Sequence, residues 1–516
     1  MRQRNEDRRH READRASRER PEGPERMSHF TDLRGYLDAL DALGDLRTIE
    51  RSVSVDLEAA AITRRSYEIR AAAPLFTNIA EDRTGMRMFG APAGVSSRAD
   101  MPLARLALSV GLPPETGAAA LVDHLVRVRD AVPVPPRAVP RENAPCKQNV
   151  LLGREATLDR FAVPRLHESD GGRYLNTWGV IVVRTPDGAW VNWSISRIMM
   201  LDGKRMTGLV VPPQHLGLVW QAWAERGEPM PYALVQGGAP AIPFVGGIPL
   251  PRGVDEAGYI GALHGEPVEV VRCETSDLEV PAHAEVVIEG HMSVGRDSRE
   301  GPFGEYAGYA STQSSTQPVY SVEAITYRDD PIWPIVPEGR PPDEYHTVTG
   351  TGRAANVLHA LRRAGLPVTT VWMPFPAAMH WTVVTVPDDW RSHLPGVDSG
   401  EFVRRIGEVI HNSGGPSAMM PVTFVLDDDI DPSNEADLLW ALSTRLHPKD
   451  RRFAWDGVVL PFMACYTEDE RKAMRGPSVV HDGLLPAWGE GRLHHSSFAQ
   501  AYPADIRRRV LEHEDG

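Results

Sequence analysis

The first regular pattern of apolar and polar residues begins shortly after residue 30. Apolar side chains recur every three or four positions, on one face of an amphipathic helix, at Leu33, Tyr36, Leu37, Leu40 and Leu43. Residues 57–70 and 117–132 repeat this helical spacing. The pattern predicts an N-terminal α/β domain over residues 27–145, which ends in the proline-rich stretch 132–145.

The pattern then changes to short β-rich runs. In residues 178–200 two such runs flank the Thr-Pro-Asp-Gly sequence at 185–188, which predicts a β-hairpin. Further runs of the same kind cover residues 268–273, 284–292 and 320–328. Closely spaced strands with Gly and Pro turns favour a barrel or a sandwich for a central domain over residues 146–340.

Helical and strand patterns alternate again in the last third of the chain. This alternation predicts a C-terminal α/β domain over residues 341–490, followed by a C-terminal helix within residues 491–516. The predicted fold class is therefore α+β with several domains. Residues 1–26 hold nine Arg and seven acidic residues and almost nothing apolar, so we expect a disordered tail, or a misassigned start upstream of Met27.

Composition narrows the functional class. The 516 residues are 42% hydrophobic and 24% charged, as in ordinary globular proteins, and the formal net charge of −14 argues against nucleic acid as a partner. Three cysteines lie far apart without metal-binding spacing, and no apolar run reaches the length of a membrane span. We expect a cytoplasmic protein with no membrane partner that binds a small molecule.

Three short motifs could together bind a metal. Asn192 lies in a β-rich run, His215 follows two prolines and Gln214, and Glu256 opens a helix-like turn after Asp255. Each has a structural alternative: an edge strand, a hydrogen-bonded histidine, and acids favoured by a helix dipole. If they meet, their mixed oxygen and nitrogen donors suit Mn²⁺ or Mg²⁺.

Two glutamates flank a bend in residues 299–311. Glu300 and Glu305 are separated by Gly-Pro-Phe-Gly, a sequence that lets the chain turn so that both carboxylates enter one cavity. A polar surface loop is the alternative. In a shared apolar site, like charge and desolvation would tune one carboxyl for general acid catalysis. Arg197, five residues after Asn192, would face away from it on a straight strand, so the two residues should serve different ligands.

Taken in order, these motifs resemble the UbiD family of reversible decarboxylases, and most closely its ferulic and cinnamic acid decarboxylases. The resemblance runs from about Phe30 to the C-terminal helix, through "RYLNTWGV", "VNWSISR", "TGLVVPPQH", "GVDEAGYIGAL", "CETSDLEVPAHAEVVIEG", "EGPFGEYAGY" and "DDIDPSNEADLLWALSTR". It implies that the central domain is a split β-barrel that binds prenylated flavin mononucleotide together with Mn²⁺ and K⁺. It also implies a homodimer, and a flavin prenyltransferase that supplies the cofactor.

The resemblance assigns roles to individual residues. Arg197 would clamp the substrate carboxylate, Glu300 would orient Arg197, and Glu305 would return a proton to carbon after CO₂ leaves. The metal ligands would be Asn192, His215 and Glu256, with the backbone of Trp190 near K⁺. The residues around the cofactor would be Asn192, Ser194, Ile195, Ser196, Arg197, Gln214, His215, Gly247, Ile248, Pro249 and Glu256.

The chain also departs from its relatives. Ser413 stands where many of them carry a lysine thought to reach the flavin phosphate, and "GIP" and "GEYAGY" replace "SMP" and "GEMHGY". These departures favour a substrate other than cinnamate, such as an α,β-unsaturated acid of secondary metabolism. We therefore expect a non-oxidative decarboxylase of acrylic-type or aromatic acids. The alternative is a flavin- or metal-binding relative without this activity, a cofactor carrier or assembly subunit.

Overall fold

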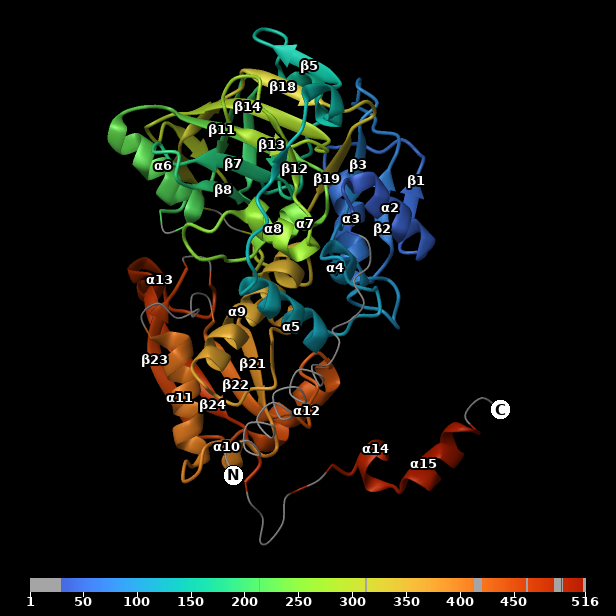
Figure 1. The fold of residues 1–516 in the computed structure, drawn as a ribbon, viewed down its shortest axis with the longest axis vertical. Helices are drawn as coiled ribbons and strands as arrows, with labels where there is room; N and C mark the ends of the chain where they lie inside the picture. Colours follow the sequence, from blue (N-terminus) through green and yellow to red (C-terminus); the bar gives the residue numbers. More distant parts are fainter. Residues whose placement is uncertain are drawn as a thin grey trace, which may run out of the picture.

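A computed structural model describes residues 29–212, 214–310, 313–412, 420–460, 463–486, 493 and 495–513 (Figure 1). The tail expected at residues 1–26 and the substituted position Ser413 lie outside the described residues. None of the helices in these ranges has both the length and the apolar character that crossing a bilayer requires.

A four-stranded sheet organises the N-terminal part of the chain, in the order β1 (Leu46–Ile49), β2 (Ala73–Phe76), β3 (Arg87–Gly90) and β19 (Ile332–Ile335). Its helices are α2 (Leu33–Ala42), α3 (Glu58–Glu68), α4 (Ala104–Ser109) and α5 (Ala118–Arg129). Helix α2 confirms the apolar pattern, since it buries Leu33, Tyr36, Leu37 and Leu40. Asp32 caps it by accepting a hydrogen bond from the backbone N of Gly35 at 2.9 Å.

Strand β19 comes from far along the chain. It pairs in parallel with β3, although the sequence pattern includes its residues in the central range 146–340. The N-terminal sheet is therefore completed by the segment that follows the central domain, and residues just after β19 are held close to both parts.

The central part is a ten-stranded sheet that curls into a half barrel (Figure 1). Its strand order is β6 (Tyr174–Asn176), β9 (Ile198–Asp202), β10 (Arg205–Gly208), β17 (Val319–Ser321), β14 (Val286–Met292), β11 (Met230–Gln236), β7 (Val180–Arg184) and β8 (Val191–Ser194). Strand β18 (Ala324–Tyr327) pairs with β14 and with β5 (Asn149–Leu152). The hairpin predicted around residues 185–188 is confirmed as the antiparallel pair β7 and β8.

Three helices and two small sheets complete this part. The helices are α6 (His215–Arg226), α7 (Ala241–Gly247) and α8 (Glu256–His264). One small sheet holds β13 (Glu279–Pro281), β12 (Glu269–Arg272) and β4 (Arg137–Ala138), and the other holds β15 (Ser298–Glu300) and β16 (Ser315–Gln317).

The C-terminal part is a five-stranded sheet in the order β20 (Thr370–Trp372), β21 (Trp381–Val386), β22 (Val422–Asp427), β24 (Arg475–Asp482) and β23 (Arg452–Val458). Its three middle strands are parallel and its two edge strands are antiparallel. Its helices are α9 (Gly350–Arg363), α10 (Trp390–His393), α11 (Ser399–His411), α12 (Glu435–Arg445) and α13 (Glu468–Ala473). Helices α14 (Phe498–Ala501) and α15 (Ala504–Leu511) extend away from the body (Figure 1).

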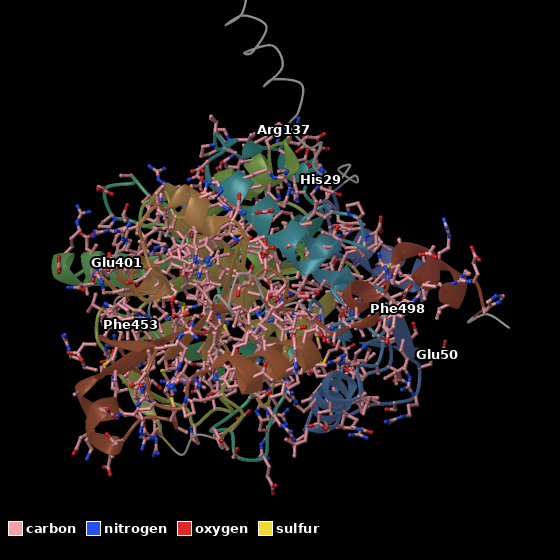
Figure 2. The ribbon with its side chains drawn as sticks, turned by 90° about the horizontal axis from the view of Figure 1, so that it is seen from below. His29, Glu50, Arg137, Glu401, Phe453 and Phe498 are labelled. Carbon is pink, nitrogen blue, oxygen red and sulfur yellow. The ribbon has the colours of Figure 1, made fainter. Side chains whose placement is uncertain are left out.

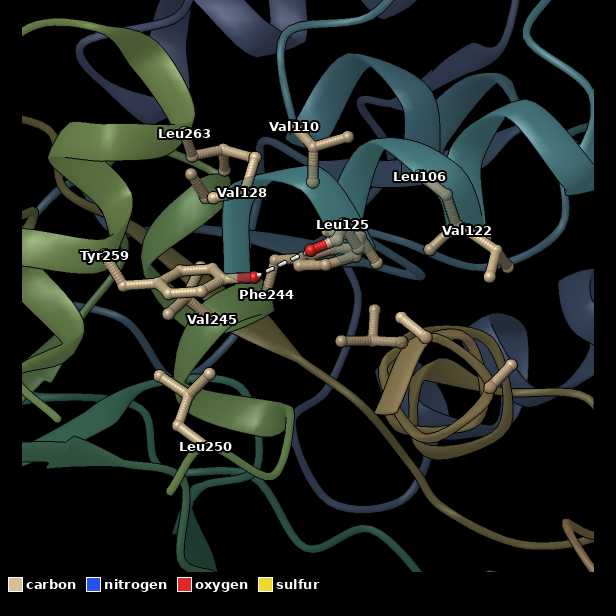
Figure 3. Packing of buried hydrophobic residues seen from close by; sticks show 14 of the residues in the cluster. Leu106, Val110, Val122, Leu125, Val128, Phe244, Val245, Leu250, Tyr259 and Leu263 are labelled. Atoms are coloured by element: carbon tan, nitrogen blue, oxygen red, sulfur yellow. Dashed lines mark hydrogen bonds between the residues drawn. The ribbon is translucent and has the colours of Figure 1, made fainter. Parts of the chain in front are cut away.

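One hydrophobic core joins the three parts. It includes residues of α4 and α5, of α7, α8 and the central sheet, and of α9 and the C-terminal sheet. Figure 3 shows Tyr259 of α8 reaching toward α5, where its hydroxyl donates a hydrogen bond to the carbonyl oxygen of Leu125 at 3.4 Å. This shared core fixes the central half barrel, which carries the site, relative to its neighbours.

Candidate active site

Arg197, Glu300 and Glu305 meet in the central half barrel. Arg197 lies between β8 and β9, and its Nε and Nη2 donate hydrogen bonds to Oε1 and Oε2 of Glu300 at 2.9 and 3.1 Å. Its Nη1 donates to Oε1 of Glu305 at 2.7 Å. The structure thus brings together the three side chains that the sequence singled out.

The bend between the two glutamates has a specific support. Glu300 ends β15, and Gly301 follows in the left-handed region with φ +85°, a conformation that favours glycine. The backbone N of Gly171 donates to the carbonyl oxygen of Pro302 at 2.8 Å, and the backbone N of Gly304 donates to Asp170 at 3.1 Å. The loop at 170–171 therefore holds the bend so that Glu305 returns toward Arg197.

Burial makes this cluster electrostatically strong. The side chains of Glu300, Glu305 and Arg197 are 1%, 12% and 16% exposed. Burial disfavours the charged form of Arg197, but the two carboxylates outweigh it, so the pKa of Arg197 is raised. Arg197 therefore stays charged, and its guanidinium carbon lies 5.0 Å from the centre of the Phe303 ring.

Tyr174 of β6 supports Glu300 from the other side. Its hydroxyl donates a hydrogen bond to Oε1 of Glu300 at 3.0 Å. Burial and the nearby carboxylate raise the pKa of Tyr174, so the hydroxyl keeps its proton and remains a donor. Glu300 is therefore fixed by Arg197 and Tyr174 together.

Arg197 keeps part of its donor capacity. A guanidinium has five N–H bonds, and three of those of Arg197 are directed at Glu300 and Glu305. The two remaining N–H bonds suit a planar group with two acceptor oxygens, such as a carboxylate. The site can therefore bind an acid in addition to its own two.

A second cluster forms where β8, α6 and α8 meet. The amide of Asn192 lies 2.8 Å from Oε1 of Glu256 and 3.5 Å from Nδ1 of His215. The same Oε1 of Glu256 is 3.7 Å from Nδ1 of His215. These three sequence-predicted residues are therefore neighbours, although 23 to 64 positions separate them.

Local structure explains how each residue reaches this cluster. His215 is the first residue of α6, and Glu256 is the first residue of α8, whose cap is Asp255. Glu256 accepts a hydrogen bond from the backbone N of Trp193 at 2.8 Å, and burial raises the pKa of its carboxyl group. The structural alternative for these two acids, a place at a helix N-terminus, therefore holds for Asp255, which caps α8, whereas the side chain of Glu256 is buried.

The donor set fits a hard divalent cation. No group of three or more His, Cys, Asp and Glu side chains suited to a metal occurs in the described ranges, and this cluster has one His and one Glu. Its third member is an amide, which can present oxygen instead of nitrogen after a rotation about its last torsion angle. One imidazole, one carboxylate and one amide match the preferences of Mn²⁺ or Mg²⁺.

The other residues predicted around a cofactor lie on two adjoining segments. Ser194 ends β8, and Ile195 and Ser196 follow it on the stretch before β9; all three are half-buried, between the buried Trp193 and Ile198. The backbone N of Ile195 donates to the carbonyl oxygen of Gly246 at 3.2 Å, which joins this stretch to the end of α7. Gly247, Ile248 and Pro249 follow there.

Two further predicted positions have protein partners of their own. The carbonyl oxygen of Trp190 accepts the backbone N–H of Thr185 at 2.9 Å, and its ring packs edge-on against His215 with centroids 4.8 Å apart. Gln214 caps α6 through its backbone, and its side chain is exposed. Neither position is brought into the Arg197 cluster.

The sequence interpretation assigned no role to three residues near Arg197. Tyr174 and Phe303 lie within motifs that it quoted, and Glu338 follows β19 in a stretch that it did not single out. A strand register would have located Tyr174 beside Arg197, because β6 pairs with β9. No sequence signal locates Glu338, since its position depends on how β19 joins the N-terminal sheet.

Family models match most of the chain. Residues 37–125, 137–341 and 346–468 match the N-terminal, the Rift-related and the C-terminal domains of 3-octaprenyl-4-hydroxybenzoate carboxy-lyase, known as UbiD. Together these segments cover the three parts of the fold.

Two curated relatives align over nearly their whole length. The chain is 42% identical over 484 residues to pyrrole-2-carboxylic acid decarboxylase of Pseudomonas aeruginosa, which covers 93% of this chain and 97% of the relative. It is 35% identical over 495 residues to ferulic acid decarboxylase 1 of Saccharomyces cerevisiae, which covers 94% of this chain and 98% of the relative.

Solved structures have the same fold. HmfF from Pelotomaculum thermopropionicum, an evolved dimeric form in complex with prFMN, covers 92% of this chain and 100% of its own, with a TM-score of 0.76 and 24% identity. Vanillic acid decarboxylase of Sedimentibacter hydroxybenzoicus covers 94% and 98%, with a TM-score of 0.79 and 24% identity. On the evidence of its domains and its relatives, the chain belongs to the UbiD family and is a carboxy-lyase.

Proposed function

We propose that this chain catalyses the reversible, non-oxidative decarboxylation of an α,β-unsaturated or aromatic carboxylic acid with prenylated FMN as cofactor. The observation that carries the proposal is Arg197, held between Glu300 and Glu305 with two N–H bonds left for a further carboxylate. The relatives act on ferulic acid and pyrrole-2-carboxylic acid, whose carboxyl groups lie on unsaturated carbon.

The cofactor would lie along the segments around Ser194–Ser196 and Gly247–Pro249. Asn192, His215 and Glu256 would hold Mn²⁺, and the backbone of Trp190 would lie near K⁺. When bound, prenylated FMN supplies an electron sink for the pair left on carbon as CO₂ departs, which no protein side chain can provide. The hydroxyl, amide and imidazole donors of these residues support this assignment.

Arg197 binds and orients the substrate acid. A substrate carboxylate that accepts its two remaining N–H bonds brings three carboxylates around one guanidinium. In a site this buried, one of the three has to carry a proton. Glu300 receives two bonds from Arg197 and one from Tyr174, whereas Glu305 receives a single bond from Arg197. Glu305 is therefore the more weakly held of the two glutamates, and it is the one to which we assign proton transfer.

Proton transfer completes the reaction. Loss of CO₂ from a carboxylate leaves a carbon that needs a proton, and Glu305 supplies it from its position beside Arg197. Glu300, fixed by Tyr174, keeps Arg197 oriented while Glu305 changes its protonation state. The two glutamates thus have different tasks because they have different hydrogen-bond partners.

The remaining parts of the proposal concern partners and place. A flavin prenyltransferase would supply the cofactor, and a homodimer is the assembly that we propose. The free cysteines Cys146 and Cys273, both buried, fit a reducing cytoplasmic location. An unsaturated acid of secondary metabolism remains the substrate class that we favour.

The test is purification after co-expression with a flavin prenyltransferase, followed by a screen of acrylic, aromatic and heteroaromatic acids for CO₂ release. We expect a bound flavin whose mass exceeds that of FMN by the prenyl group. The variant Glu305→Gln should keep this flavin and lose turnover by a factor of about 10² to 10⁴. Full activity of the variant would remove Glu305 from the proton-transfer role.

A further inference from the structure

A further carboxyl group, that of Glu338, lies on the segment after β19, close enough to Glu305 and Arg197 to interact with their charges. Glu338 lies where the backbone is tightly held: Arg64 of α3 donates to the carbonyl oxygen of Pro337 at 3.2 Å, and the backbone N of Gly339 donates to Asp343 at 2.9 Å. Arg64 and Asp343 also form an ion pair at 3.2 Å, with the Asp343 side chain fully buried. The position of Glu338 is therefore fixed by its neighbours.

This segment packs directly against the bend that carries Glu305. A Cβ atom on Gly308 would lie 3.0 Å from the Cα of Arg340, so the two backbones are in contact. The side chain of His346 reaches the carbonyl oxygen of Tyr306 at 2.7 Å, and the rings of Tyr306 and Tyr345 are 4.5 Å apart. Two independent contacts thus hold the Glu338 segment beside the catalytic loop.

The carboxyl group of Glu338 has an unusual environment. It makes no side-chain hydrogen bond with any part of the chain that the structure describes, and the residue is half-buried. Burial first, and then the negative charges of Asp343, Glu305 and Glu344, raise its pKa well above the ordinary range, while Arg197 opposes the rise. This environment favours the protonated form of Glu338, and the charges that act on it include that of Glu305.

The groups that surround Glu338 come from several elements. Asp343, Glu344 and Tyr345 belong to its own segment, Glu305 belongs to the bend, and Arg197 to the stretch between β8 and β9. Arg64 of α3 and His346 lie behind Asp343, to which both are bonded. Arg64 and His346 are thus both paired with Asp343, and among the described residues no cation forms an ion pair with Glu338.

The proposed reaction creates a need for such a group. Each turnover converts a carboxylate and one proton into CO₂ and a C–H bond, so Glu305 ends the turnover without its proton. The next turnover cannot begin until Glu305 is protonated again. Its side chain is only 12% exposed, so solvent has little direct access to it. A neighbouring neutral carboxyl group can pass its proton on and then take another from solvent.

We propose that Glu338 reloads Glu305 with a proton between turnovers, and this inference rests on the proposed function. The proton leaves the Glu338 carboxyl and reaches the Glu305 carboxylate directly or through one water molecule. Glu338 then recovers a proton from solvent, so that charge and protons balance over the cycle. Glu338 acts through Glu305 and is a positioning residue for the proton, not a group that touches the substrate.

The test separates the first turnover from the later ones. In Glu338→Gln the neutral amide keeps the shape of the side chain but cannot relay a proton. We expect a first turnover at the wild-type rate, followed by a steady state about a hundredfold slower. We also expect the dependence of kcat on pH to lose one ionisation that wild type shows. Glu338→Asp, which keeps a carboxyl group, should restore part of the steady-state rate. The control is Glu168→Gln, an exposed acid on the neighbouring loop, which should leave both phases unchanged.

Three results would overturn the role of Glu338. They are an unchanged steady state in Glu338→Gln, an equal slowing of both phases, or a first turnover that is slowed alone. Flavin content is measured in every variant, so that a loss of cofactor is recognised. If wild type releases CO₂ from no acid, the proposed function itself fails. The protonation of Glu338 is then tested by infrared difference spectra of wild type and Glu338→Gln, recorded without flavin at neutral pH. A protonated-carboxyl band that is lost in the variant supports a neutral Glu338. If the two spectra show no such difference, the inference is overturned.

Discussion

At the scale of single residues, one guanidinium organises the site. Arg197 binds Glu300 with two parallel N–H bonds, a geometry that only a planar fork provides. In Arg197→Lys the positive charge remains but the fork is lost. We expect kcat/KM to fall by at least about a hundredfold while the flavin spectrum is retained, because the proposed clamp on the substrate carboxylate loses one of its two hydrogen bonds.

The matched control is Arg296→Lys in the same central part, where the guanidinium stacks on Trp220 and bonds Gln317. Steady-state kinetics and flavin absorbance of both variants check the prediction. Equal losses of activity in the two variants would mean that arginine-to-lysine changes disturb the half barrel in general.

A second residue makes stability depend on pH. Glu344 is 1% exposed, and it accepts hydrogen bonds from the hydroxyl of Tyr67 and, at 3.0 Å, from the backbone N of Ala93. Burial raises its pKa to about 7. The folded protein therefore holds a proton that the unfolded chain, with a glutamate pKa of about 4.3, releases earlier. The free energy of unfolding should fall as pH rises from about 4.3 to 7, by roughly 4 kcal/mol, and then level off.

The variant Glu344→Gln tests this pH dependence, because an amide of the same shape does not titrate. Urea unfolding at pH 5 and pH 8 should give a smaller difference for the variant than for wild type. Glu68→Gln, on the exposed surface of α3, is the control and should follow wild type. A variant that keeps the full wild-type pH dependence would assign it to another group.

Residue types and spacing predicted Arg197, Glu300 and Glu305 as candidates, but their meeting follows from the fold. On a straight strand Asn192 and Arg197 face opposite sides, and the structure keeps them apart by a break between β8 and β9. The pairing of β6 with β9 and the position of β19 decide where Tyr174 and Glu338 lie. These long-range pairings leave no local pattern in the sequence.

At the scale of elements, the bend between Glu300 and Glu305 depends on a glycine in the neighbouring loop, Gly171. A Cβ atom on Gly171 would lie 2.1 Å from the carbonyl oxygen of Gly301, so no other residue fits there without moving the bend. We expect Gly171→Ala to displace Glu305 from Arg197 and to lower kcat by tenfold or more, since misplaced catalytic groups lose their alignment. Gly117→Ala is the control, because a Cβ atom there meets nothing within 4 Å.

Kinetics and flavin content of the two glycine variants, with melting temperatures, check this prediction. Normal turnover in Gly171→Ala would show that the bend adjusts without moving Glu305. Local patterns predicted the elements themselves well, since α2, α5, α9 and the hairpin of β7 and β8 form where apolar periodicity or turn residues indicate. The contact between Gly171 and Gly301 had no such signal, because glycine contributes no side chain to any pattern.

At the scale of the whole molecule, the three parts are interlocked. Strand β19 completes the N-terminal sheet, and a single core joins α5, α8 and α9. Changes of pattern along the sequence can predict consecutive domains. They do not predict that a later strand, here β19, pairs with a sheet formed by an earlier part of the chain. This arrangement also places Glu338, which follows β19 along the chain, close to Glu305 and Arg197.

The C-terminal segment, formed by helices α14 and α15, does not pack against the body of the protein (Figure 1). Helices α14 and α15 extend away from the body, on the side opposite Glu401 and Phe453 in the view of Figure 2. No residue of α15 is buried, and Val510 and Leu511 are 41% and 54% exposed. Exposed apolar side chains on a segment that extends away from the body are typical of an interface. In the proposed homodimer, the partner at this interface is a second copy of the chain.

We therefore expect the protein to be a dimer in analytical ultracentrifugation, and the double variant Val510→Asp, Leu511→Asp to shift the distribution toward monomer. Charges buried against an apolar surface are costly, so the change should weaken association by at least about tenfold. Val132→Asp is the control, because Val132 is an apolar residue that is 84% exposed and belongs to the proline-rich stretch 132–145, not to the C-terminal segment. A double variant that sediments as wild type would place the dimer contact elsewhere and leave α15 with a different partner surface.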